Sequence, residues 1–239
     1  MKKTLIATEQ KRADVAEARA AWAETQKTLD PAKLVFVDQT WASTAMTRRY
    51  GRAPKGQRLA GFVPQGHWKT TAFIAASRND RITAPCVFDG AINGGSFLAD
   101  VEQMLVPSLS PSDTVIMDNL SSHKVKGVRE AIGAALLCLP PCSPGFDPIE
   151  QAFAKLKSWP REIAKRTIAT LWEALGEVAK LFPPTECANY FRHSGYSPLT
   201  REAGKPEPAR VAQTTGFGDF DFSGSRVDGG YHQPYRGML

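Results

Sequence analysis

Apolar residues gather in short runs, separated by polar connectors that contain glycine or proline. The runs that carry this pattern span residues 34–38, 59–63, 70–76, 82–88, 114–117 and 136–139. Apolar runs of four to eight residues bounded by turn signals are typical of buried strands. The first strand is expected to end at Asp38, before the polar pair Gln39–Thr40, and the fifth run to end at Asp118.

Helical spacing occurs between and around these runs. Residues 5–29, 93–105, 124–135, 148–158 and 167–181 are predicted helices, and a short helix is expected after Pro183–Pro184. The helix near residue 148 has the clearest start, because Asp147 can cap it and Pro148 suits its first position. Trp159–Pro160 is expected to interrupt or kink that helix.

The order of these elements predicts an α/β fold and three parts. Residues 1–33 form an N-terminal linker helix, residues 34–198 a single core domain, and residues 199–239 a C-terminal tail. The tail is predicted to be disordered, since residues 201–239 contain seven glycines and no apolar periodicity.

Composition indicates an acidic partner. The 239-residue chain has a net charge of +6 and a pI near 9.2, which suits binding to a polyanion such as nucleic acid. Its four cysteines form no CxxC pair, and reduced thiols are favoured over a zinc site. With neither a signal peptide nor an apolar run long enough to cross a membrane, we expect a cytoplasmic protein without a membrane partner.

Three acidic residues stand at positions where a fold can bring them together. Asp38 and Asp118 each follow a predicted strand, and Glu150 lies in the first turn of a predicted helix. Carboxylates are the preferred ligands of divalent cations in phosphodiester chemistry. Taken singly, each has a simpler interpretation: a solvated acid at a strand end, or a glutamate that favours the helix dipole.

Two longer motifs carry a family resemblance. They are Asp118–Lys124, which reads Asp-Asn-Leu-Ser-Ser-His-Lys, and Leu139–Glu150, which reads Leu-Pro-Pro-Cys-Ser-Pro-Gly-Phe-Asp-Pro-Ile-Glu. With Asp38, these motifs resemble the catalytic domain of bacterial insertion-sequence transposases of the mariner superfamily, over roughly residues 1–198. The resemblance implies a ribonuclease-H-like fold with a mixed central sheet flanked by helices, in which the first and fourth strands are neighbours.

The resemblance also implies the site. Asp38, Asp118 and Glu150 would be both the catalytic residues and the ligands of two Mg²⁺ or Mn²⁺ ions, with Asp38 bridging the pair. Expected contacts with DNA comprise Arg48, Arg49, Arg52, Lys55, Asn119, His123, Lys155 and Lys157. The lysines that follow Glu150 can equally form a solvated helix face, and Trp41 and Trp68 can stack on bases or pack in the core.

The chain departs from the family pattern at several positions. Gln39 follows the first Asp where the family usually has Glu, and Cys142 occupies the position of an aromatic residue. Residues Gly145–Asp147 read Gly-Phe-Asp where the family has Asp-Leu-Asn. Only 31 residues separate Asp118 from Glu150, a few short of the usual spacing. About 33 residues precede the first strand, too few for the helix-turn-helix modules of full-length relatives.

The function that follows is metal-dependent hydrolysis of DNA at transposon ends and strand transfer to target DNA. A homodimer is expected, because two ends must be processed together, and a separate helix-turn-helix polypeptide is a possible partner. Two alternatives stay open: an inactive transposase remnant that binds DNA or dimerises, and a nuclease of the same fold that acts on other substrates.

Overall fold

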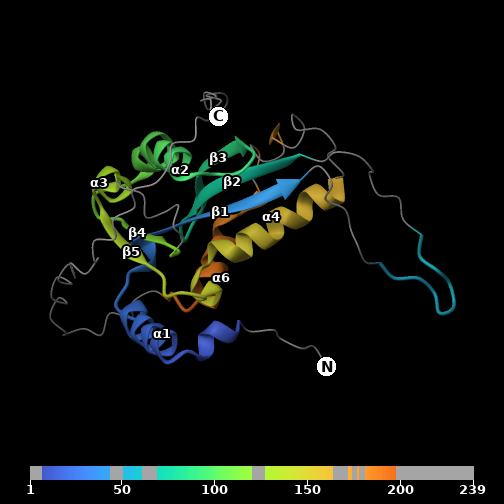
Figure 1. Ribbon diagram of the computed structural model, residues 1–239, viewed down its shortest axis with the longest axis horizontal. Coiled ribbons are helices and arrows are strands. Elements are labelled where there is room, and N and C mark those ends of the chain that lie inside the picture. Colours follow the sequence, from blue (N-terminus) through green and yellow to red (C-terminus); the bar gives the residue numbers. More distant parts are fainter. Residues whose placement is uncertain are drawn as a thin grey trace, which may run out of the picture. The chain divides into compact units, whose positions relative to one another are not determined.

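The protein is built on a five-stranded mixed sheet with helices on both faces (Figure 1). This computed structural model describes residues 7–43, 51–60, 69–119, 127–163, 172–173, 177 and 181–197, and only the backbone of 159–163. The strands are β1 Leu34–Ser43, β2 Thr70–Ser77, β3 Ile82–Asp89, β4 Thr114–Met117 and β5 Ala135–Cys138. Their spatial order is β3-β2-β1-β4-β5.

The strand pairing confirms the predicted mixed α/β class. β1 pairs antiparallel with β2 and parallel with β4, and β4 pairs parallel with β5. The first and fourth strands are therefore neighbours, as expected. Helices lie on the two faces of this sheet: α2 Gly94–Asp100 and α3 Val128–Ile132 on one, α4 Ile149–Ile163 and α6 Pro184–His193 on the other (Figure 1).

Strand alternation divides the core into two layers. Phe36, Phe73 and Ile116 pack against Phe153 of α4 and Phe191 of α6. The intervening residues, such as Val35 and Val115, pack against Phe97, Val101 and Val128 on the opposite face. Asp38 has the same parity as Phe36, so its side chain belongs to the face that α4 covers.

Helices and turns outside the sheet complete the described part. Helix α1 spans Ala13–Gln26, inside the predicted helix at 5–29. Shorter elements are η1 Thr8–Lys11, η2 Pro31–Lys33, the π-helix η3 Val101–Leu105, η4 Val106–Ser108 and η6 Pro144–Phe146. No helix among the described residues is long and apolar enough to cross a membrane.

Five local predictions need correction or lie outside the described residues. β1 continues five residues beyond Asp38, because Asp38–Ser43 pair with β2. Leu59 and Ala60 are not in a strand, and the rest of that predicted strand is outside the described residues. α4 runs through Trp159–Pro160 to Ile163, so the predicted interruption there is wrong. Most of the predicted helix at 167–181 and the whole tail from residue 198 are outside the described residues.

Candidate functional site

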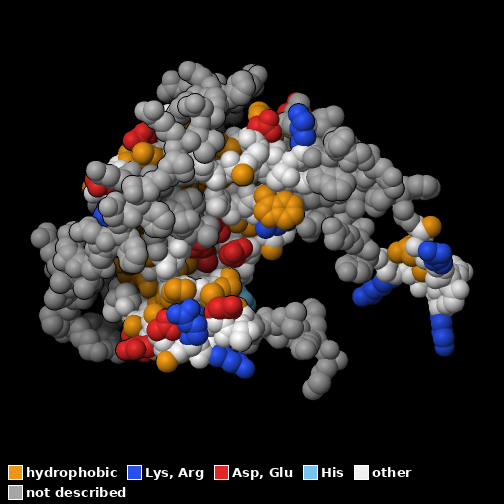
Figure 2. All heavy atoms as spheres, in the orientation of Figure 1, with side chains coloured by type: hydrophobic (Ala, Val, Ile, Leu, Met, Phe, Trp, Pro, Cys, Tyr) orange, Lys and Arg blue, Asp and Glu red, His pale blue; other side chains and the backbone are white. Residues whose placement is uncertain are grey.

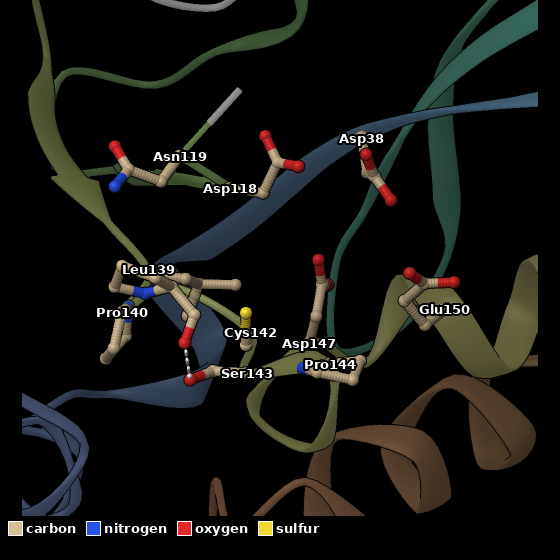
Figure 3. A pocket seen from close by; sticks show the side chains of 11 residues that line it. Asp38, Asp118, Asn119, Leu139, Pro140, Cys142, Ser143, Pro144, Asp147 and Glu150 are labelled. Atoms are coloured by element: carbon tan, nitrogen blue, oxygen red, sulfur yellow. Dashed lines mark hydrogen bonds between the residues drawn. The ribbon is translucent and has the colours of Figure 1, made fainter. Parts of the chain in front are cut away.

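A pocket of about 410 Å³ opens beside the middle of β1 and the end of β4. Four carboxylates line it, together with Asn119 and the turn formed by residues 139–144 (Figure 3). The carboxylates belong to Asp38, Asp118, Asp147 and Glu150. On the space-filling surface, acidic side chains gather between β1 and the start of α4 (Figure 2). Residues distant in the sequence thus share one concave, acidic site.

The sheet register places Asp38 and Asp118 next to each other. The parallel ladder between β1 and β4 runs from Leu34 opposite Thr114 to Val37 opposite Met117. One residue further along both strands come Asp38 and Asp118, with the same parity and therefore on the same face. Asp38 is almost fully buried, at 7% exposure, whereas Asp118 is half-buried.

Glu150 and Asp147 reach the pocket from the start of α4. Asp147 Oδ1 accepts a 3.2 Å hydrogen bond from the backbone N–H of Ile149, the first residue of this helix. The predicted helix-capping contact is therefore present. Figure 3 shows the Asp147 side chain pointing up into the pocket, between Asp118 and Glu150 and toward Asp38.

The turn before β5 closes in spite of the short spacing between Asp118 and Glu150. Helix α3 ends at Ile132, and Gly133 follows in the left-handed conformation with φ of 59°. Glycine adopts this conformation without the steric cost of a Cβ. Only Ala134 then separates Gly133 from β5, and Glu150 lines the pocket together with Asp118.

Burial and clustered negative charge govern the ionisation of Asp38. Burial, the largest cause, raises the pKa of Asp38 to about 8. The 2.7 Å hydrogen bond from the Gln39 N–H opposes this shift, the charges of Asp118 and Glu150 add to it, and Lys157 lowers the pKa. The site therefore favours a bound cation or proton at Asp38.

Burial and the neighbouring acids also govern the ionisation of Asp147. Burial raises the pKa of Asp147 well above its ordinary value, and the charges of Asp38, Glu150 and Asp118 act in the same direction. From the sequence, Asp147 was assigned only as a helix cap. The signal that could have identified it was an aspartate at the position where the resembled family has Asn.

The donor set fits Mg²⁺ or Mn²⁺ in its chemistry, since these hard cations prefer carboxylate oxygens. No group of three His, Cys, Asp or Glu side chains within the described residues is spaced to hold a metal ion. The side chains that would offer carboxylate oxygens to such an ion are those that line the pocket.

Helix α1 holds the turn that carries this site. Arg19 donates hydrogen bonds to Ser143 Oγ at 2.7 Å and to the Cys142 carbonyl at 3.3 Å. Gln10 donates a third, of 2.6 Å, to the Cys142 carbonyl. At the other end of the turn, Tyr196 donates a 2.9 Å hydrogen bond to the Phe146 carbonyl. These contacts fix the path of the chain into Asp147 and α4.

The predicted DNA-contact residues have different surroundings. Lys157 on α4 lies 5.9 Å from the ring of Trp41, whose side chain is 56% exposed. Lys155 instead bonds within the fold, to Glu186 at 2.7 Å and to the Leu181 carbonyl at 2.6 Å. Arg52 and Lys55 are exposed in the irregular segment 51–60. Arg48, Arg49, His123 and Trp68 lie outside the described residues.

Comparisons with known proteins concern the family and the fold of the chain. The family model described as DDE superfamily endonuclease matches residues 33–171. Among solved structures, a strand transfer complex of Mos1 superposes with a TM-score of 0.63 at 12% identity, covering 80% of this chain and 61% of that one. A Mos1 mariner paired end complex with Mn gives a TM-score of 0.62 at 14% identity, covering 81% of this chain and 62% of that one.

These structures share the fold, which confirms the predicted ribonuclease-H-like architecture. The chain spans less than two thirds of the length of either Mos1 chain. No curated protein matches the sequence.

Proposed function

This chain belongs to the DDE superfamily of endonucleases, and from that premise we propose that it is the catalytic domain of a mariner-superfamily DNA transposase. It would hydrolyse phosphodiester bonds at the ends of a bacterial insertion sequence and join the freed 3′-hydroxyl to target DNA. The observation that carries this proposal is the shared pocket: Asp38, Asp118 and Glu150 come from three separate elements and line one cavity.

The three carboxylates would hold two Mg²⁺ or Mn²⁺ ions, with Asp38 as the ligand common to both. When bound, such ions activate a water molecule and stabilise the leaving oxygen of the scissile phosphodiester. Asp38 suits the shared position because its nearly buried carboxylate experiences the charges of both other acids. Asn119, exposed at the rim of the pocket, can donate an amide hydrogen bond to a phosphate oxygen.

Basic and aromatic residues near the pocket would bind the DNA. Lys157 is the best placed of the described cations, because its charge already acts on Asp38. Arg52 and Lys55 are exposed and would contact phosphates, and Arg48, Arg49 and His123 remain proposed contacts. Lys155 is a weaker candidate, since its ammonium group is held by Glu186 and the Leu181 carbonyl.

Other polypeptides would complete the activity. Recognition of the transposon ends requires a DNA-binding module, which we propose is a separate helix-turn-helix polypeptide. Pairing two ends would require a homodimer on DNA in the bacterial cytoplasm. The Mos1 complexes that share this fold include a paired end complex and a strand transfer complex, which supports such an assembly.

A second candidate is a transposase remnant that binds DNA or dimerises without cutting. One observation favours it: the acids of the described pocket are not spaced to hold a metal ion. Cleavage decides between the two candidates, because a remnant retains DNA binding only.

The test measures nicking of supercoiled plasmid with Mn²⁺, Mg²⁺ or neither ion. A second assay follows the joining of a duplex oligonucleotide with a free 3′-hydroxyl to plasmid. Wild type should nick and join only with a divalent ion, and Asp38→Asn and Glu150→Gln should abolish both reactions. Nicking without joining would indicate a nuclease acting on other substrates. DNA binding without any nicking would support the remnant.

A further inference from the structure

Asp147 contributes a fourth carboxylate to the pocket, and it does so from a position that also starts α4. We propose that Asp147 is an additional ligand for the divalent ion of this site, acting beside Asp38, Asp118 and Glu150. This inference rests on the proposed metal-dependent function and deepens it.

The first argument is geometric. Asp147 is 4% exposed, lines the pocket, and points into it between Asp118 and Glu150 (Figure 3). One oxygen, Oδ1, accepts the N–H of Ile149. The side chain forms no other hydrogen bond within the described parts of the chain. Its Oδ2 atom is therefore the oxygen left to bind a cation.

The second argument concerns charge. A buried carboxylate is neutralised by a bound proton or a cation, because burial removes it from water and other acids repel its charge. No lysine or arginine in the described residues forms an ion pair with Asp147, and three acids act on it instead. A divalent ion in the pocket would compensate all four carboxylates together.

A role as helix cap alone does not account for this residue. The capping bond needs only a neutral acceptor, and asparagine provides the same Oδ1 in the same shape without a charge. An aspartate in a buried acidic pocket must take up a proton or bind a cation, and either requirement is absent for asparagine. Capping and cation binding can coexist, since each uses a different oxygen of Asp147.

The experiment separates these two roles. Asp147→Asn preserves the cap and removes the carboxylate, and Asp147→Ser is a second variant that keeps a capping oxygen. Asp30→Asn is the matched control, because Asp30 Oδ1 accepts a 3.1 Å hydrogen bond from the Ala32 N–H in the same way but outside the pocket. Mn²⁺ affinity is measured by calorimetry on the full chain, and Tm is measured without metal.

We expect Asp147→Asn to bind Mn²⁺ about 10-fold or more weakly, with a metal-free Tm equal to or above that of wild type. Asp147→Ser should also bind Mn²⁺ weakly, and Asp30→Asn should bind Mn²⁺ as tightly as wild type. If both Asp147 variants bind as tightly as wild type while Asp38→Asn binds weakly, Asp147 is a cap only. If wild type itself binds no Mn²⁺, the proposed metal-dependent function fails and this inference fails with it.

Discussion

Arg19, in the N-terminal helix α1, donates a 2.7 Å hydrogen bond to the hydroxyl of Ser143, a residue 124 positions later in the turn before α4. The guanidinium also lies 4.9 Å from the ring of Phe146 in the same turn. The N-terminal helix is thus attached directly to the segment that carries Asp147 and Glu150. Its contribution is positional, since Arg19 is not among the residues that line the pocket.

Replacing Arg19 should loosen this turn. Arg19→Met keeps an apolar stem but removes the donors to Ser143 and Cys142, and a hydrogen bond from a charged group contributes about 1.5–3 kcal/mol. Because Arg19 is only half-buried, we expect a loss near the low end of that range in urea unfolding. Mn²⁺ binding should weaken as well, because the two acids after the turn are less well positioned.

The control for this prediction is Lys27→Met, directly after the last residue of α1. Lys27 forms an exposed ion pair with Glu24 at 2.7 Å, and exposed pairs contribute about 0–1 kcal/mol. The stability and Mn²⁺ affinity of Lys27→Met should stay close to those of wild type. An Arg19→Met protein with unchanged Mn²⁺ affinity would show that the turn is fixed without α1.

The neighbouring positions of Asp38 and Asp118 illustrate what the sequence could predict. The family resemblance implied that the first strand lies beside the fourth, and the register confirms that neighbourhood. The predicted end of the first strand, at Asp38, was wrong. Residues 38–43 are held by antiparallel pairing with β2, whose residues come about 30 positions later. A local polar pair, Gln39–Thr40, carries no information about such a distant partner.

The second carboxylate near α4 was missed for a related reason. Asp147 stands in a strong helix-start pattern, and that local interpretation is correct. Its entry into the pocket depends instead on the path of the turn at 140–146, which is set by contacts with α1 and with Tyr196. Contacts of this range leave no periodic signature in the sequence.

The metal-free protein should lose stability as pH rises. The folded protein keeps the Asp38 proton up to about pH 8, whereas the ordinary pKa is 3.8. The stabilising contribution is therefore complete below pH 4 and is lost as pH rises through 8. The slope of the unfolding free energy from this group is at most about 1.4 kcal/mol per pH unit. Asp38→Asn should make the profile obtained by urea unfolding from pH 4 to 9 less steep, with the dependence from Asp100 and Asp147 remaining.

Asp100 provides a contrast on the opposite face of the sheet. Burial, the largest cause, raises the pKa of Asp100 to about 7, and a hydrogen bond with the Cys86 thiol opposes this shift. Asp100→Asn should reduce the pH dependence of the unfolding free energy only up to about pH 7. Excess Mn²⁺ should suppress the contribution of Asp38 to the pH dependence of stability. The contribution of Asp100 should stay unchanged. Equal profiles for wild type and Asp38→Asn would contradict the assigned ionisation.

A buried ion pair supports the sheet away from the pocket. Arg78, directly after β2, donates a 2.6 Å hydrogen bond to Asp113, directly before β4, and both side chains are buried. Removing one partner of such a pair leaves an uncompensated charge and costs about 3–5 kcal/mol. Asp113→Ala should therefore be strongly destabilised in urea unfolding. Asp80→Ala breaks the exposed pair with Arg81 and should change stability by about 0–1 kcal/mol. Similar losses in both variants would rule out a special role for the buried pair.

Trp41 offers an exposed ring close to the acidic pocket. It follows Asp38 by three residues on β1, and Lys157 lies over its ring. An aromatic ring beside a cation can stack on an unpaired base, and such stacking contributes about 1–3 kcal/mol per base. Trp41→Ala should thus weaken binding to single-stranded or end-frayed DNA by about 5- to 150-fold. Fluorescence anisotropy with a labelled oligonucleotide measures this change.

The matched control is Leu59→Ala, which removes the other large apolar side chain that is exposed among the described residues. Leucine provides no ring for stacking, so DNA affinity should stay within about twofold of wild type if stacking is the cause. The unfolding free energy and Mn²⁺ affinity of Trp41→Ala should match those of wild type. The Trp41 side chain is 56% exposed and offers no oxygen to a metal ion. Equal losses of DNA affinity in both variants would point to a general effect of exposed apolar area. A loss confined to Trp41→Ala would assign base stacking to the strand that carries Asp38.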